Sequence, residues 1–283
     1  SAAFADGVIF TGSEDGNLYA LDAANGTELW RFDTGADVVG TPSVSNGQVY
    51  AALPSDDGLF VLDAKTGAQK FQIQEPTGGG MSPAALSGEG VFAGGKDSQT
   101  MNRFDATTGE LVWSYETGEV MGAVPAIVDG VVYAGGEDGI VFALDAESGA
   151  FLWKFTTDGL IDYGPSVANG VVYVGTDAGT FYAISGNGPG TPAASPAASA
   201  PGESAPVATF LWQSDAGEDG WIVNDLAMLP DGNVAAVGDG VNDVVVFSPD
   251  GDVVEKWTPS TTVSGVDSLL EGIAIDPNGN IYL

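Results

Sequence analysis

Hydrophobic residues in this chain occur in short runs, rich in β-branched and aromatic side chains, that alternate with Gly-containing turns. One run, Asn17-Leu-Tyr-Ala-Leu-Asp22, recurs in four further variants along the chain. These variants end at Asp63, Asp105, Asp145 and Ser185, at successive intervals of 41, 42, 40 and 40 residues. Such constant spacing indicates a repeat protein whose unit is about 40 residues long.

Each unit has the same order of turns and strands. It opens with a turn dipeptide, at Asp6-Gly7, Asn46-Gly47, Glu89-Gly90, Asp129-Gly130 and Asn169-Gly170. A β-rich run, a second turn and the Tyr-Ala-Leu-Asp run follow, and a third turn then leads into a run with a large aromatic residue. Asp-Gly and Asn-Gly supply the positive φ angles of tight hairpins, so each unit predicts four short antiparallel strands.

The predicted fold is therefore all-β, a β-propeller of four-stranded blades with about seven repeat units. A generic β-sandwich is the alternative, but sandwiches lack a fixed period of this kind. The sequence is also compatible with a fragment of a larger propeller or of a protein with two propellers.

The stretches Asp15–Trp30 and Asp138–Trp153 resemble the repeat of the PQQ-like, or quinoprotein-like, β-propellers. The resemblance covers residues 1–186. In that family a glycine and an aromatic residue of each copy form a docking motif, in which the aromatic ring packs between neighbouring blades. The resemblance assigns this structural role to Gly26, Trp30, Gly67, Phe71, Gly109, Trp113, Gly149 and Trp153, and to Trp212 in a later outer strand.

The resemblance leaves two functional kinds open. Quinoprotein dehydrogenases hold pyrroloquinoline quinone (PQQ) and Ca²⁺ with the help of a vicinal Cys pair and basic residues, whereas other members are non-enzymatic and present surfaces to partners. This chain has no Cys, and its Lys and Arg number only seven. That scarcity argues against a PQQ site, so we expect no catalytic residue and no cofactor-binding residue.

Residues 187–206 are rich in Pro, Ala and Ser and predict a linker or an insertion. Phe210-Leu-Trp-Gln213 resembles Glu28-Leu-Trp-Arg31, the outer strand that the fifth unit otherwise lacks. We therefore favour an insertion inside the fifth blade over a domain boundary near residue 205.

Residues 207–283 resemble NHL-type propeller repeats. Leu229-Pro-Asp-Gly-Asn-Val234 returns as Ile275-Asp-Pro-Asn-Gly-Asn-Ile281, and the last unit is incomplete. An unpaired blade edge invites strand addition, so we expect a second copy or another chain to complete this blade.

Charge limits the partners further. Asp and Glu number 39, the formal net charge is −32, and there is no His. Nucleic acid and anionic membrane surfaces are excluded as partners because both require clustered Lys and Arg. Cys/His zinc sites and Ser-His-Asp triads cannot be built without those residues.

The acidic turns also raise the question of metal binding. Asp15, Asp57 and Asp138 carry hard oxygen ligands and are candidate Ca²⁺ ligands, although no EF-hand loop is present. The interpretation we favour is that each aspartate accepts hydrogen bonds from its own hairpin turn.

The sequence thus predicts a non-catalytic propeller, exported to the periplasm or cell surface of a bacterium or archaeon, that binds a protein partner or serves as a scaffold. Two alternatives remain: a fragment of a PQQ-dependent dehydrogenase, and a subunit of an extracellular polymer built by strand exchange.

Overall fold

The computed structural model describes residues 2–36, 38, 40–53, 58–185, 209–215, 222–239, 244–248, 251–257, 274–275 and 281–282. All regular structure in these residues is β-strand. The described part contains no helix long and apolar enough to cross a membrane.

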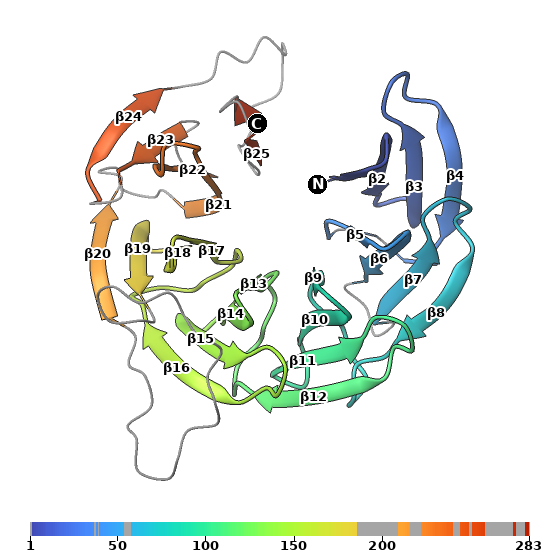
Figure 1. Ribbon diagram of the computed structural model, residues 1–283, viewed down its shortest axis with the longest axis horizontal. Helices are drawn as coiled ribbons and strands as arrows, with labels where there is room; N and C mark the ends of the chain where they lie inside the picture. Colours follow the sequence, from blue (N-terminus) through green and yellow to red (C-terminus); the bar gives the residue numbers. More distant parts are fainter. Residues whose placement is uncertain are drawn as a thin grey trace. The chain divides into compact units, whose positions relative to one another are not determined.

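The strands form six four-stranded antiparallel sheets and one strand pair (Figure 1). Sheet 1 contains β1 (Ala2–Ala5), β2 (Val8–Gly12), β3 (Asn17–Asp22) and β4 (Glu28–Asp33). Sheet 2 contains β5 (Ser43–Ser45), β6 (Gln48–Ala52), β7 (Leu59–Asp63) and β8 (Gln69–Ile73). Sheet 3 contains β9 (Ala85–Ser87), β10 (Gly90–Gly95), β11 (Thr100–Asp105) and β12 (Leu111–Glu116).

The remaining strands repeat this order. Sheet 4 contains β13 (Ala126–Val128), β14 (Val131–Gly135), β15 (Ile140–Asp145) and β16 (Phe151–Thr156). Sheet 5 contains β17 (Ser166–Ala168), β18 (Val171–Gly175), β19 (Thr180–Ser185) and β20 (Thr209–Asp215). Sheet 6 contains β21 (Ile222–Met228), β22 (Val234–Asp239), β23 (Val244–Phe247) and β24 (Val253–Trp257), and β25 (Ala274–Ile275) pairs with β26 (Ile281–Tyr282).

The chain divides into two compact units. Unit 1 comprises Ser1–Ile127 and Ala146–Gly149, and unit 2 comprises Val128–Asp145 and Ala150–Leu283. In unit 1, one apolar core joins sheets 1 and 2 around Phe10 and Leu62, and another joins sheets 2 and 3 around Leu59 and Phe104. In unit 2, corresponding cores join sheets 4 and 5, and sheets 5 and 6. Burial of these facing side chains is the main stabilising term of such a repeat.

The hairpin turns follow the dipeptides, with one exception. Asp6-Gly7, Asn46-Gly47, Asp129-Gly130 and Asn169-Gly170 have positive φ at both residues, as type I′ turns require. The predicted turn at Glu89-Gly90 is wrong by one residue, because the turn falls on Gly88-Glu89 and Gly90 opens β10. Gly88 supplies the positive φ (58°), whereas Gly90 must lack a Cβ because one would lie 2.6 Å from the Phe92 ring.

The strand order of the fifth sheet is relevant to whether the Pro-rich segment is an insertion within a blade. Its fourth strand, β20, pairs with β19 and places Trp212 opposite Ala183. This is the arrangement that the insertion interpretation requires. Residues 187–206 themselves lie outside the described residues.

Candidate functional site

Three of the predicted docking aromatics, in the outer strands of sheets 1, 2 and 3, meet the third hairpin turn of the next repeat. The Trp30 indole lies against Gly67, where a Cβ would come within 2.7 Å of Trp30 Cδ2. Its Nε1 donates a hydrogen bond to the carbonyl oxygen of Ala64 (3.0 Å), in the same turn. The turn therefore needs glycine for two reasons: its φ of +70° and the ring that covers it.

Trp113 repeats this contact within unit 1. A Cβ on Gly149 would lie 2.7 Å from Trp113 Cδ2, and Trp113 Nε1 donates to the Ala146 carbonyl (3.1 Å). Trp113 is 9% exposed, so the indole N–H has exchanged water for this one carbonyl. The hydrogen bond fixes the ring as well as satisfying the donor.

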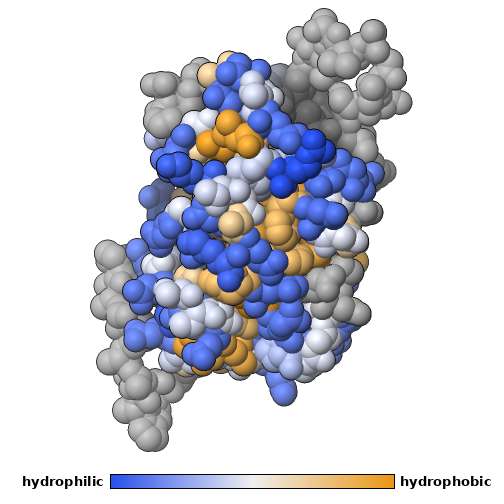
Figure 2. All heavy atoms as spheres, turned by 90° about the vertical axis from the view of Figure 1, so that its right-hand side faces the viewer, coloured by the Kyte–Doolittle hydropathy of each residue, from blue (hydrophilic) through white to orange (hydrophobic). Residues whose placement is uncertain are grey.

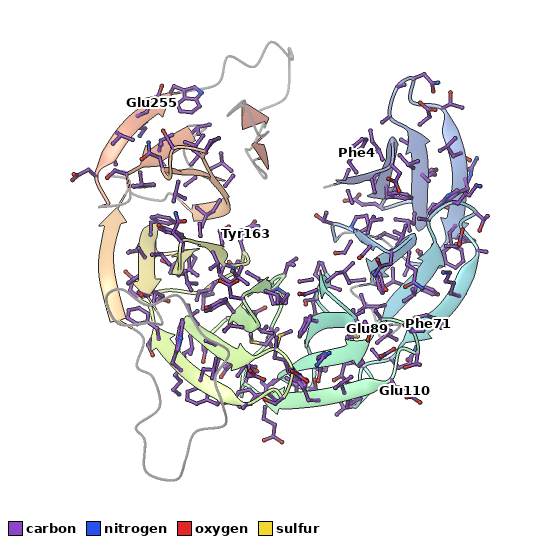
Figure 3. The ribbon with its side chains drawn as sticks, viewed as in Figure 1. Phe4, Phe71, Glu89, Glu110, Tyr163 and Glu255 are labelled. Carbon is purple, nitrogen blue, oxygen red and sulfur yellow. The ribbon has the colours of Figure 1, made fainter. Side chains whose placement is uncertain are left out.

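Phe71 occupies the same position without an indole N–H (Figure 3). Its ring covers Gly109, where a Cβ would lie 2.9 Å from Cδ2. The carbonyl that an indole would bind belongs to Ala106, and the Tyr50 hydroxyl donates to it instead (3.3 Å). Burial, and secondly the charge of Asp105, raise the pKa of Tyr50 to about 12. Tyrosine thus replaces the hydrogen bond that the Trp-to-Phe change removes.

The remaining docking residues that the sequence predicts are Gly26, Trp153 and Trp212. Gly26 has the same φ (+72°) as Gly149, but no atom among the described residues lies within 4 Å of the position of its Cβ. Trp153 is 4% exposed and packs beside Tyr133, with ring centroids 5.9 Å apart. The side chain of Trp212 lies outside the described residues.

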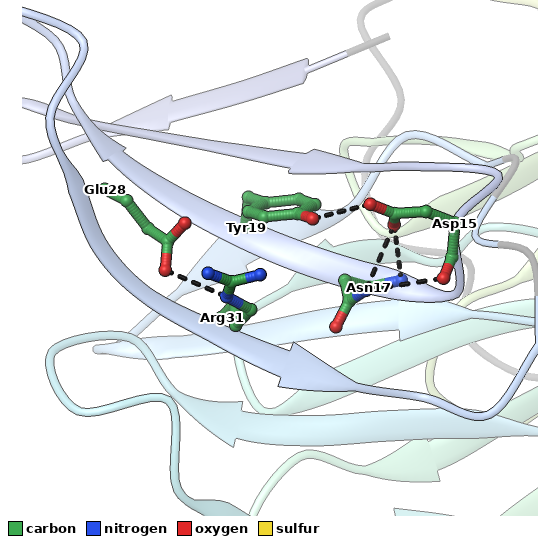
Figure 4. A network of polar contacts seen from close by, with 5 residues as sticks. All are labelled: Asp15, Asn17, Tyr19, Glu28 and Arg31. Atoms are coloured by element: carbon green, nitrogen blue, oxygen red, sulfur yellow. Dashed lines mark hydrogen bonds and ion pairs between the residues drawn. The ribbon is translucent and has the colours of Figure 1, made fainter.

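The acidic hairpins hold their aspartates in local hydrogen bonds. Asp15 Oδ1 accepts the backbone N–H of Asn17 (3.0 Å) and its side-chain amide (3.2 Å), and Oδ2 accepts the Tyr19 hydroxyl (2.6 Å; Figure 4). The Tyr19 hydrogen bond lowers the pKa of Asp15. Beside them Arg31 and Glu28 form an ion pair of 3.0 Å.

Asp138 and Asp57 are the other two candidate Ca²⁺ ligands. Asp138 Oδ1 accepts the Ile140 N–H (3.0 Å), and Asp57 lies outside the described residues. Within the described ranges there is no group of three or more Asp or Glu residues that could hold a metal ion. Calcium binding at these turns therefore stays a prediction.

Connecting loops between sheets are anchored by one buried apolar residue each. Val38, Met121 and Ile161 are between 1% and 3% exposed and cover Gly12, Gly94 and Gly135 respectively, where any Cβ would collide with them. The sequence interpretation missed these anchors, although a glycine recurs at or near the end of the second strand in four of the first five units, at Gly12, Gly94, Gly135 and Gly175.

The loop over residues 157–165, in unit 2, is the best defined of these connections. Thr157 Oγ1 contacts the carbonyls of Gly139 (2.7 Å) and Gly159 (3.0 Å), and the Leu160 N–H donates to Asp177 Oδ1 (2.7 Å). The same loop leaves Leu160 42% exposed and Tyr163 40% exposed. Tyr163 is labelled in Figure 3. Apolar side chains on a pinned loop are pre-organised for contact with a partner.

Outer strands expose apolar residues as well. Figure 2, which views the side of the molecule that bears β4 and β8, shows apolar patches among mainly hydrophilic residues. Leu29 in β4 is 51% exposed, and Leu111 and Val112 in β12 are 45% and 50% exposed. Single exposed apolar residues are ordinary, so the anchored loop is the more specific candidate.

Comparisons with known proteins agree with the repeat. The sequence model of the family described as "Outer membrane protein assembly factor BamB" matches residues 1–101 and 97–267. The BamB of Yersinia pestis is 29% identical over 138 residues, which is 43% of this chain and 34% of that protein. The quinohemoprotein alcohol dehydrogenase ADH IIB of Pseudomonas putida is 31% identical over 134 residues, 40% of this chain and 19% of that enzyme.

The crystal structure of BamB from Moraxella catarrhalis matches with a TM-score of 0.65 and 17% identity, over all of this chain and 92% of that one. This likeness confirms the predicted β-propeller fold. The curated relatives are matched over only a small part of their own length, 6% for the beta-alanine-activating enzyme of Danio rerio. The sequence model covers most of the chain, and the chain therefore belongs to the PQQ-like β-propeller family described as outer membrane protein assembly factor BamB.

Proposed function

We propose that this chain is a non-catalytic β-propeller that binds a protein partner outside the cytoplasm. The observation that carries the proposal is the loop over residues 157–165, which is pinned by Ile161 and holds Leu160 and Tyr163 toward solvent. The BamB relatives, named as outer membrane protein assembly factors, support a role in assembly and a location in the bacterial envelope.

Two features of the chain weigh against the quinone-dependent relatives as functional guides. The chain has no Cys and only seven Lys and Arg residues to bind an anionic cofactor against a net charge of −32. The carboxylates of Asp15, Asp63, Asp105 and Asp138 accept hydrogen bonds from their own turns, so their roles are explained without chemistry on a substrate.

Site-specific photo-crosslinking in the native host tests the proposal. A photoreactive amino acid at Tyr163 is expected to give one defined adduct with a partner protein. The same group at Glu110, on an exposed hairpin turn, is the control and should give none (Figure 3).

Affinity supplies a second readout. Leu160→Ser is expected to weaken the association about 10-fold, because a central apolar contact contributes more than 1 kcal/mol. Equal adducts from Tyr163 and Glu110, or an unchanged affinity of Leu160→Ser for the partner, would show that this loop is not the binding site.

A further inference from the structure

Glu75 is a buried carboxylate with an unused oxygen. It follows β8 in unit 1 and is 3% exposed. Its Oε2 accepts the backbone N–H of Thr77 (2.8 Å) and the Thr77 hydroxyl (2.7 Å). Its Oε1 is buried without a hydrogen-bond partner among the described residues. No ion pair joins Glu75 to a basic side chain of the described residues.

The unpartnered oxygen of Glu75 lies close to Gly95 and to two hydroxyl groups. A Cβ on Gly95 would lie 2.9 Å from Glu75 Oε1, 2.9 Å from Thr100 Oγ1 and in collision with Ser98 Oγ. The Ser98 and Thr100 hydroxyls are themselves 2.6 Å apart. Three side-chain oxygens therefore converge beside Gly95, in a place where a hydrogen fits and a methyl group does not.

Asn102 lies beside this cluster. It is fully buried, its Nδ2 donates to Thr100 Oγ1 (2.9 Å), and its Oδ1 has no partner among the described residues. The corresponding positions of the other repeats hold aromatic residues, namely Tyr19, Phe60, Phe142 and Tyr182. A buried amide in place of an aromatic ring costs stability unless both its polar atoms are satisfied.

Sheet 5 shows how the same place is completed without a ligand. There Asp158, in the loop after β16, accepts hydrogen bonds from the Thr176 hydroxyl (3.1 Å) and the Thr180 hydroxyl (2.6 Å), one on each oxygen. Thr180 begins β19 as Thr100 begins β11, and Thr176 follows β18 where Gly95 ends β10. Sheet 3 thus has a glycine where sheet 5 has the hydroxyl that satisfies the carboxylate.

We propose that Glu75, Ser98 and Thr100 bind one hard cation, of which Ca²⁺ and Na⁺ are the two candidates. Carboxylate, hydroxyl and amide oxygens are the ligands that such ions prefer. A cation would satisfy Glu75 Oε1 and balance the charge of a buried carboxylate, whereas a water molecule would satisfy the oxygen alone.

Thermal unfolding tests the proposal. The chain is stripped with chelator, exchanged into tetramethylammonium chloride, and melted with Ca²⁺ or Na⁺ at constant ionic strength. One ion is expected to raise Tm by about 5 °C at a hundredfold excess over its Kd. Calorimetric titration should then show one bound ion per chain.

Matched variants separate the site from general screening. Glu75→Gln is expected to abolish the response. The substitution removes one negative charge and replaces a carboxylate oxygen, which could bind the ion, with an amide NH₂ group, which cannot. Glu110→Gln makes the same change on an exposed turn and should keep the response in full. Gly95→Ala keeps the Glu75 carboxylate but places a methyl group among the three oxygens, so it should also abolish the response.

The outcomes are distinct. A wild-type response to Ca²⁺ or Na⁺ that Glu75→Gln loses and Glu110→Gln keeps supports the site and identifies its ion. A wild-type melting temperature equal in all three salts, or a Glu75→Gln variant that still responds, overturns the proposal.

Discussion

Replacing Gly67 with alanine should destabilise unit 1 much more than the same change at Gly26. Both glycines occupy the third hairpin turn of their repeat, and their φ angles are +70° and +72°. They differ in one respect: the Trp30 ring covers Gly67, whereas nothing among the described residues lies within 4 Å of a Cβ on Gly26. The pair therefore separates the backbone cost from the cost of displacing the ring.

The magnitudes follow from these contacts. An L-residue in the left-handed region costs about 1–2 kcal/mol, and both variants incur this cost. The new Cβ of Gly67→Ala would also lie 2.7 and 2.8 Å from two Trp30 carbons, well inside van der Waals contact. Overpacking of this kind costs about 1–3 kcal/mol. We expect Gly67→Ala to lose about 2–5 kcal/mol and Gly26→Ala about 1–2 kcal/mol.

Urea unfolding followed by tryptophan fluorescence measures both variants. A Trp30→Ala background completes a double-mutant cycle, in which the cost of Gly67→Ala should fall to that of Gly26→Ala. Equal costs of the two glycine variants, or a Gly67→Ala cost that persists without Trp30, would refute the docking geometry.

The other predictions concern single contacts. Trp113→Phe should lower the free energy of unfolding by about 1 kcal/mol, because the Ala146 carbonyl loses its donor, and urea titration measures it. Because burial raises the pKa of Tyr50 to about 12, above its unfolded value near 10, its contribution to stability is complete below about pH 10. That contribution is lost as the pH rises from about 10 to 12, and Tyr50→Phe should flatten this part of the stability curve. Ile161→Ala should cost about 2–5 kcal/mol and speed limited proteolysis in the loop over residues 157–165; an unchanged cleavage rate would contradict the anchor.

The fold could be predicted because every blade repeats the same local chemistry. Asn46-Gly47 specifies a type I′ turn by itself, and the apolar run of each strand lies between two such signals. The Trp30 contact with Gly67 also has a sequence signal, since both residues recur at fixed positions in the unit. These features depend on residues close together in the chain.

Features that depend on neighbouring blades could not be predicted in this way. Tyr50 supplies the hydrogen bond that Phe71 lacks, yet it comes from an earlier strand of the same sheet and reaches the next blade's turn at Ala106. Glu75 meets Gly95 only after sheets 2 and 3 have packed. The one available sign was that Asn102 breaks the pattern of aromatic residues at its repeat position.

A reconstitution with PQQ tests the central claim most directly. The purified chain is incubated with PQQ and Ca²⁺, freed of unbound quinone, and assayed for quinone absorbance and for alcohol-dependent dye reduction. The account predicts neither, because the chain has no Cys and only seven Lys and Arg residues with which to bind an anionic quinone. A stoichiometric quinone absorbance together with dye reduction would contradict it and make the chain an enzyme.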